Sequence, residues 1–176
     1  GQSIIVTGVG QHQMWAAQYC AFQEPNTLIT SGGLGSMGFE VPAAIGAKVG
    51  RPDKTVWSVA GDGGVQMTMS DLATAVENNI EVKFAIFNNG VLGMVHQLQD
   101  FFFKKEYFAT VYSGNPDFVK LAEAYGITGI RVTDKSQVAG AIQQAMEMPG
   151  PVVIDFRVEE GENVYPMIPA GESVRE

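Results

Sequence analysis

Short apolar runs rich in β-branched residues alternate along this chain with segments of helical pattern, and this alternation restricts the fold more than any other feature. Six runs are expected to be strands: Ser3–Val9, Leu28–Ser31, Thr55–Ala60, Val82–Asn88, Gly129–Val132 and Val152–Val158. Helices are expected between them: Gln13–Cys20, Gly38–Val49, Ser70–Asn79, Pro116–Tyr125 and Ser136–Met148. The pattern predicts an α/β fold, a three-layer, doubly wound, mainly parallel sheet of about six strands with helices on both faces.

The segments outside this pattern give further expectations. Ser70 and Asn115 have the side chains of helix N-caps, and Pro116 suits a first helical turn. Residues 91–113, which contain "FFFKKEYFAT", fit no single template and are expected to form a loop that is mobile or covers a site. We expect one folded domain over residues 1–158 and an extended, partly disordered tail over 159–176. The abrupt start on a strand suggests a domain cut from a longer chain.

Charge and composition exclude some functions. The net charge of −8 argues against a main role in binding nucleic acid or an anionic membrane, since both require clustered Lys and Arg. No apolar run approaches the roughly 18 residues of a membrane span. The single cysteine, Cys20, cannot form an internal disulfide, which favours a reducing compartment, and we expect a cytoplasmic protein.

Four Gly-rich or polar segments follow predicted strands: "GQHQ", "GGLGSMG", "GDGG" and "NNGVLGM". In an open parallel sheet they should meet at the carboxyl edge, where ligands bind. Glycine lets backbone N–H groups approach a ligand closely, and helix N-termini favour anions such as phosphate. The segments together predict a site for a phosphorylated ligand.

A dinucleotide site is one alternative. Gly33, Gly35 and Gly38 fit G-x-G-x-x-G after a strand, but this fingerprint also requires an acid at the end of the next strand. Asp53 has the spacing yet precedes that strand, whereas Asp62 ends the strand but lies too far on. The chain therefore lacks the acid that the fingerprint requires. A dinucleotide site would predict NAD binding that needs no metal.

Asp62 and Asn89 follow neighbouring predicted strands, and these two residues favour a magnesium site over a dinucleotide site. Mg²⁺ takes oxygen ligands in octahedral geometry and commonly combines one or two protein groups with phosphate oxygens and water. Asp-Gly and Asn-Gly are also common turn pairs, so each residue alone would be weak evidence. Together, beside two other Gly-rich segments, they favour a cation site.

The same residues carry a family resemblance. Gly-Asp-Gly at 61–63 followed by Asn-Asn at 88–89 resembles the thiamine-diphosphate motif. The flanking stretches "GQHQMWAAQ", "SGGLGSMGF", "NPDFVKLAEAYG" and "ENVYPMIPAG" are similar to the C-terminal, diphosphate-binding domain of the acetohydroxyacid synthase (acetolactate synthase) catalytic subunit. The resemblance covers almost the whole chain but only about a third of such a subunit.

The resemblance implies a role for each matching residue. Asp62, the Asn89 side chain and the Val91 carbonyl would ligate Mg²⁺, and Leu98 would shape the substrate pocket where the family usually has tryptophan. The Gly35 carbonyl would accept a hydrogen bond from the amino group of the cofactor's pyrimidine, and Met37 would hold the cofactor in a bent conformation. Gly35 and Met37 are therefore the candidate catalytic residues. The diphosphate would be contacted by backbone groups and two side chains: Gly63, Gly64, Gly93, Met94, Gln11 and His12.

The implied reaction is decarboxylation of pyruvate and carboligation of the product to a second 2-oxo acid. In the family a glutamate from a pyrimidine-binding domain on a partner subunit activates the cofactor, and a middle domain holds FAD; neither domain matches these 176 residues. We therefore expect slow catalysis by the chain alone and a homodimer or larger assembly, with a pyrimidine-binding domain or a regulatory subunit as further partners. Two alternatives stay open: the cofactor-binding chain of a split 2-oxo acid decarboxylase, and a binding module inactive without a partner.

Overall fold

The computed structural model describes residues 3–168 and 171–173. Its centre is a six-stranded sheet with the order β2-β1-β3-β4-β6-β5, and every neighbouring pair is parallel. The strands are β1 (Ile4–Thr7), β2 (Leu28–Thr30), β3 (Val56–Gly61), β4 (Val82–Asn88), β5 (Thr128–Val132) and β6 (Val152–Arg157). The predicted α/β fold is confirmed, and each predicted strand is present with ends shifted by a few residues.

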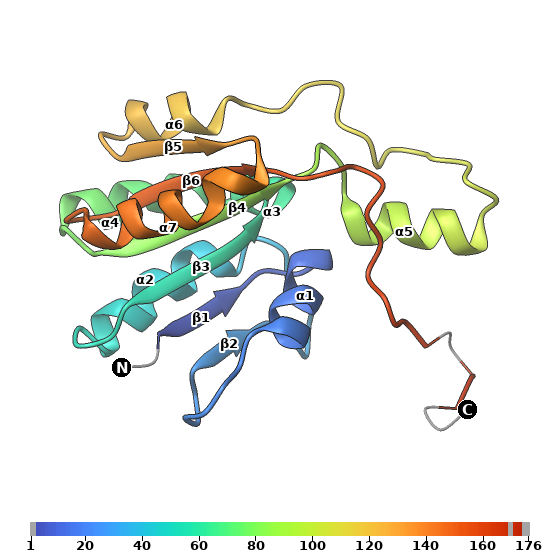
Figure 1. The fold of residues 1–176 in the computed structure, drawn as a ribbon, viewed down its shortest axis with the longest axis horizontal. Helices are drawn as coiled ribbons and strands as arrows, with labels where there is room; N and C mark the ends of the chain where they lie inside the picture. The colour runs from blue at the N-terminus through green and yellow to red at the C-terminus, as the bar shows by residue number, and fades with distance from the viewer. Residues whose placement is uncertain (1–2, 169–170, 174–176) are drawn as a thin grey trace.

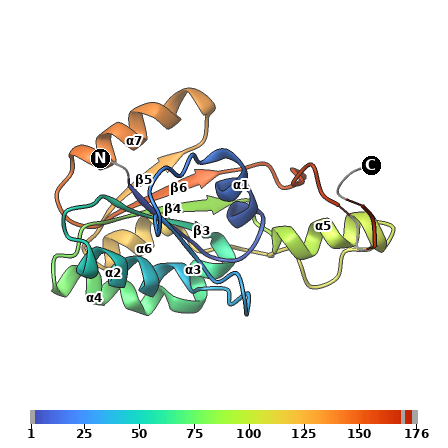
Figure 2. The same ribbon diagram turned by 90° about the horizontal axis from the view of Figure 1, so that it is seen from below.

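Helices cover both faces of the sheet (Figure 1). The α-helices are α1 (Gln11–Tyr19), α2 (Glu40–Gly50), α3 (Asp62–Thr68), α4 (Leu72–Glu77), α5 (Gly93–Phe102), α6 (Phe118–Ala124) and α7 (Val138–Glu147), with short 3₁₀ turns η1 (Met69–Asp71) and η2 (Lys135–Gln137). Right-handed crossovers in this strand order place α2, α4 and α6 on one face and α1 and α7 on the other. Figure 2 shows α7 on one side of the sheet and α2, α4 and α6 on the opposite side.

The core lies mainly between the sheet and the α2, α4 and α6 layer. Val41 of α2, Phe84 and Ile86 of β4 and Phe118 of α6 are all buried there. A smaller cluster lies beneath α7 and includes the fully buried Ile154. Apolar side chains on both faces explain why strands such as β4 read as nearly continuous apolar runs. None of the described helices has the length and apolar character to span a bilayer.

Two helices at the edge of the sheet were not predicted. α3 begins directly at Asp62 with two glycines in its first turn, and its local helix propensity is low, so packing of the buried Val65 decides its conformation. The segment expected to be a loop, residues 91–113, contains α5, whose start at Leu92 has no side-chain cap. Figure 1 shows α5 projecting beyond the sheet beside the C-terminal segment.

Several predicted helix ends were wrong. Ser70 lies in η1 and caps nothing, because the chain already turns through α3 and η1. Asp117, rather than Asn115, caps α6: its carboxylate accepts from the backbone N–H groups of Val119 and Lys120. Pro116 therefore precedes the cap. Because Asn115 does not cap α6, its side chain makes a different contact, described below.

β6 ends at Arg157, and the division into a domain over residues 1–158 and a tail over 159–176 stays a prediction. Residues 159–168 contain neither helix nor strand, yet Val164 is fully buried. The buried amide of Gln97 on α5 donates to the Val164 carbonyl and accepts from the Val164 N–H. The described tail is thus attached to α5; residues 169–170 and 174–176 of the predicted tail lie outside the described residues.

Candidate cofactor site

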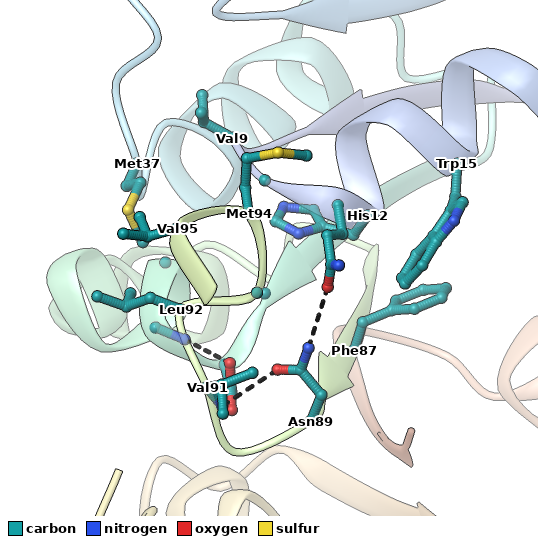
Figure 3. Close-up of a pocket in the computed structure, with 17 residues that line it drawn as sticks. Val9, His12, Trp15, Met37, Phe87, Asn89, Val91, Leu92, Met94 and Val95 are labelled. Atoms are coloured by element: carbon teal, nitrogen blue, oxygen red, sulfur yellow. Dashed lines mark hydrogen bonds between the residues drawn. The ribbon is translucent and has the colours of Figure 1, made fainter. Parts of the chain in front are cut away.

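A cavity of about 160 Å³ lies at the carboxyl ends of β1, β3 and β4. Figure 3 shows Trp15 and Phe87 at one end of it and Met37, Leu92 and Val95 at the other. The residues proposed from sequence that line this cavity are Gln11, His12, Met37, Asp62, Gly63, Gly64, Asn89, Val91, Gly93 and Met94. Gly35 and Leu98 do not line it. The fold therefore brings together most of the residues that the resemblance selected.

Asp62 is held by three hydrogen bonds at the end of β3. Its Oδ1 accepts from the Gly63 N–H at 2.9 Å. Its Oδ2 accepts from the Gly90 N–H at 2.9 Å and from Asn115 Nδ2 at 2.6 Å. Burial raises the pKa of the Asp62 carboxyl, and these donors oppose that rise. Because each carboxylate oxygen has about two lone-pair sites, Oδ1 keeps capacity for a cation, whereas Oδ2 is saturated.

Asn89 is oriented by Gln11. Asn89 Nδ2 donates to Gln11 Oε1 at 3.3 Å, and Asn89 Oδ1 accepts from the Val91 N–H at 3.2 Å (Figure 3). Gln11 Nε2 in turn donates to Gln97 Oε1 and to the Glu162 carbonyl. Both amide hydrogens of Gln11 are therefore used, and its structural effect is to fix the direction of the Asn89 amide. The Asn89 oxygen keeps a lone pair.

His12 is a buried ring without a complete set of partners. Its Nε2 makes no hydrogen bond to any described residue, although the side chain is buried. Burial lowers the pKa of His12 to about 4, so the imidazole is neutral near pH 7. A neutral ring has one N–H donor and one acceptor nitrogen. An orphaned ring nitrogen in the wall of this cavity matches a ligand oxygen that accepts a hydrogen bond.

Two glycines make the cavity possible. A Cβ at Gly93 would lie 2.2 Å from Gln11 Oε1, and a Cβ at Gly63 would lie 2.2 Å from the Tyr112 hydroxyl. Since real Cβ atoms do not approach so closely, no larger residue fits at either position without movement. Because a glycine has no side chain, a bound group can approach the backbone closely at the starts of α3 and α5. This cradle is compatible with a diphosphate.

The loop between β2 and α2 is exposed. Leu34 is 95% exposed, and Gly35 is an exposed residue with a φ of 66°, a left-handed conformation that favours glycine. Met37 reaches the cavity: its methyl carbon lies 3.4 Å from the position of a Cβ at Gly63. Leu98 is partly exposed on α5.

The donors at this edge are those of a hard cation. Among the described residues no group of three or more His, Cys, Asp or Glu side chains could hold a metal. One carboxylate, one amide oxygen and backbone carbonyls remain, and such oxygen donors suit Mg²⁺ or Ca²⁺ better than Zn²⁺. The residues present thus fit a magnesium–diphosphate group that completes the coordination with its own oxygens.

Sequence reasoning missed the residues that support this site. Gln97 was overlooked beside Leu98, and Asn115 was interpreted as a helix cap. No local signal separates such amides from surface residues, because their partners lie far away in the sequence. Glu40 is a further buried residue near this edge: it is fully buried, neither carboxyl oxygen has a hydrogen-bond partner among the described residues, and it packs behind Gly8 and Gly64.

Comparison with known proteins agrees with this geometry. The family model described as "Thiamine pyrophosphate enzyme, C-terminal TPP binding domain" matches residues 8–156. The chain is 51% identical to the acetolactate synthase large subunit of Corynebacterium glutamicum, over 97% of this chain and 28% of that protein. It is 44% identical to the acetolactate synthase isozyme 2 large subunit of Escherichia coli, over 97% of this chain and 31% of that protein. The chain spans less than a third of the length of these relatives.

Proposed function

The chain belongs to the thiamine pyrophosphate enzymes through their C-terminal cofactor-binding domain, and on this premise we propose that it binds thiamine diphosphate through Mg²⁺ at the carboxyl edge of β1, β3 and β4. The observation that carries the proposal is the cavity itself. Free oxygen capacity on Asp62 and Asn89, the orphaned nitrogen of His12 and the glycine cradle all meet there.

In this proposal Asp62 Oδ1, Asn89 Oδ1 and the Val91 carbonyl hold the cation. The carboxylate offsets part of its charge, and the amide and carbonyl supply neutral oxygens. The cation in turn neutralises the diphosphate, which would otherwise face the buried Asp62 carboxylate. The backbone N–H groups of Gly64, Gly93 and Met94 and the ring N–H of His12 also bind the diphosphate. Gly63, whose own N–H donates to Asp62 Oδ1, lets the diphosphate approach the start of α3 closely. Gln11 contributes by orienting Asn89.

The proposed reaction is that of acetolactate synthases. When bound, thiamine diphosphate supplies the carbon nucleophile that adds to the carbonyl of a 2-oxo acid such as pyruvate and permits loss of CO₂. This chain would position the cofactor: Met37 lies beside the cavity, and the Gly35 carbonyl would accept a hydrogen bond from the amino group of the cofactor's pyrimidine. Positioning of this kind lowers a barrier by removing the entropy of alignment.

A second domain is part of the proposal. The cavity of about 160 Å³ is smaller than the roughly 300–1,000 Å³ of pockets that enclose a drug-sized ligand. It has room for the diphosphate and cation rather than for the whole cofactor, and the loop that contains Gly35 is exposed at its side. We propose that a pyrimidine-binding domain, in the same or a partner chain, covers this loop. Dimerisation, FAD in a further domain and a regulatory subunit follow only from the family.

The test is calorimetric titration of thiamine diphosphate into the chain, with Mg²⁺ and with chelator, followed by a CO₂ assay with pyruvate. Asp62→Ala should abolish Mg²⁺-dependent binding because the diphosphate loses its neutralising ion. Asp53→Ala is the matched control, since this exposed carboxylate lies outside the cavity and pairs with Arg51. Binding that survives Asp62→Ala would refute the metal site, and binding without CO₂ release would favour a module that requires its partner domain.

A further inference from the structure

Asn115 connects the proposed cation ligand Asp62 to Asn88 at the end of β4. It lies in the segment before α6, and its Nδ2 donates to Asp62 Oδ2 at 2.6 Å and to Asn88 Oδ1 at 3.1 Å. Its Oδ1 accepts from Gln66 Nε2 at 3.2 Å. The three side chains that contact this amide come from α3 and β4, so Asn115 closes a network across two elements.

Asp155, at the other end of this network, determines which groups donate and which accept along it. Asp155 on β6 is fully buried; its Oδ2 accepts from Arg131 Nε and forms an ion pair with Arg157 Nε, at 3.2 Å each. Its Oδ1 accepts from Asn88 Nδ2 at 2.9 Å. Because the carboxylate only accepts, Asn88 must turn its amino group toward Asp155 and its oxygen toward Asn115. Asn115 must then donate, which directs its amino group toward Asp62 as well.

The consequence falls on the Asp62 carboxylate. Asn115 and the Gly90 N–H together saturate Oδ2, so the carboxylate cannot rotate without losing two hydrogen bonds. Oδ1 is left as the oxygen with a free lone pair. We propose that Asn115 is a positioning residue that fixes Asp62 for one-oxygen binding of the cation, with its own orientation imposed by Asp155 through Asn88. This inference rests on the proposed function, since it assumes that Asp62 is a cation ligand.

The test measures cation affinity rather than turnover. Mn²⁺, a spectroscopic substitute for Mg²⁺, is titrated into the chain at saturating thiamine diphosphate and followed by electron paramagnetic resonance. Asn115→Ala should lower Mn²⁺ affinity about 10–100-fold, as loss of an outer-shell partner of a metal ligand commonly does. Asn163→Ala is the matched control, because Asn163 Nδ2 also donates to a carboxylate, Asp100 Oδ2, at 2.9 Å. The control should retain wild-type affinity.

The outcomes separate this inference from the proposed function. Wild-type Mn²⁺ affinity in Asn115→Ala, together with loss of binding in Asp62→Ala, would overturn the inference and leave the cation site intact. Wild-type affinity in Asp62→Ala would overturn both. An equal loss in Asn115→Ala and Asn163→Ala would also overturn the positioning role, since it would show general destabilisation. If near-ultraviolet circular dichroism shows that Asn115→Ala does not fold, Asn115→Ser replaces it and is judged by the same comparison.

Discussion

Substitution of Glu40 by glutamine should make the protein more stable in alkaline solution and leave it unchanged in acid. The Glu40 carboxyl is fully buried, and neither oxygen has a hydrogen-bond partner among the described residues. Burial raises its pKa from 4.5 to about 7, and the nearby backbone N–H groups of Gly38 and Glu40 oppose this rise only in part. Glutamine has nearly the shape of the protonated carboxyl but cannot ionise.

The magnitude follows from linkage between protonation and folding. A carboxyl whose pKa is raised in the folded state contributes its full stabilisation of the protein at pH values below its pKa in the unfolded state. This contribution is lost as the pH rises through its pKa in the folded state. For Glu40 the window runs from pH 4.5 to about 7. At 1.36 kcal/mol per pH unit the loss amounts to about 3 kcal/mol. The free energy of unfolding of Glu40→Gln should therefore exceed that of the wild type by at most about 3 kcal/mol at pH 8 and equal it below pH 4.5.

His12 makes the comparison with wild type essential. Burial lowers the pKa of His12 from 6.5 to about 4, so its contribution has the opposite sign: it is present above pH 6.5 and is lost as pH falls to about 4. The two slopes offset each other in the wild-type profile. His12 is unchanged in Glu40→Gln and cancels in the difference between the two proteins. The difference is therefore the quantity to measure.

The assay is urea unfolding followed by tryptophan fluorescence at pH values from 4 to 8, with the free energy of unfolding extrapolated to water. Glu123→Gln on α6 serves as the control, because this side chain is exposed and its replacement removes a charge without altering burial. A Glu40→Gln difference that is the same at pH 4 and pH 8 would refute the reasoning. A pH-dependent difference of equal size in the control would do so too.

Three further predictions concern the packing of Gly8, the attachment of the tail and the proposed substrate pocket. Gly8→Ala should destabilise by about 1–3 kcal/mol, because its Cβ would lie 2.3 Å from Glu40 Oε2; in a Glu40→Ala background the cost, measured by urea unfolding, should largely disappear. Gln97→Leu should speed hydrogen exchange of the Val164 amide about tenfold or more, as it loses its buried acceptor; unchanged exchange would show that packing alone holds the tail. Leu98→Trp should shift the acceptor preference between 2-oxobutyrate and pyruvate about tenfold by narrowing the pocket, and an unchanged product ratio would remove Leu98 from the substrate site.

Part of this molecule could be predicted because the relevant signals are local. Strands such as β4 and β6 are short apolar runs, and their periodicity depends only on adjacent residues. Gly-Asp-Gly and Asn-Asn lie at the ends of β3 and β4, which are parallel neighbours, so the sheet must bring them to one edge. Helix α5 escaped prediction, since its start at Leu92 has no capping side chain and its conformation depends on packing.

The amino-acid sequence by itself determined the layered sheet and the edge at which Asp62 and Asn89 meet, because these depend on local periodicity and chain direction. Only the tertiary structure decided how each polar group is held. Asn115 reaches Asp62 across 53 positions, and Gln11 reaches Gln97 across 86. An amide has the same letter in the sequence whether it caps a helix or orients a carboxylate. Its partner is selected when the strands assemble, since a buried donor must then find the acceptor that the fold places beside it.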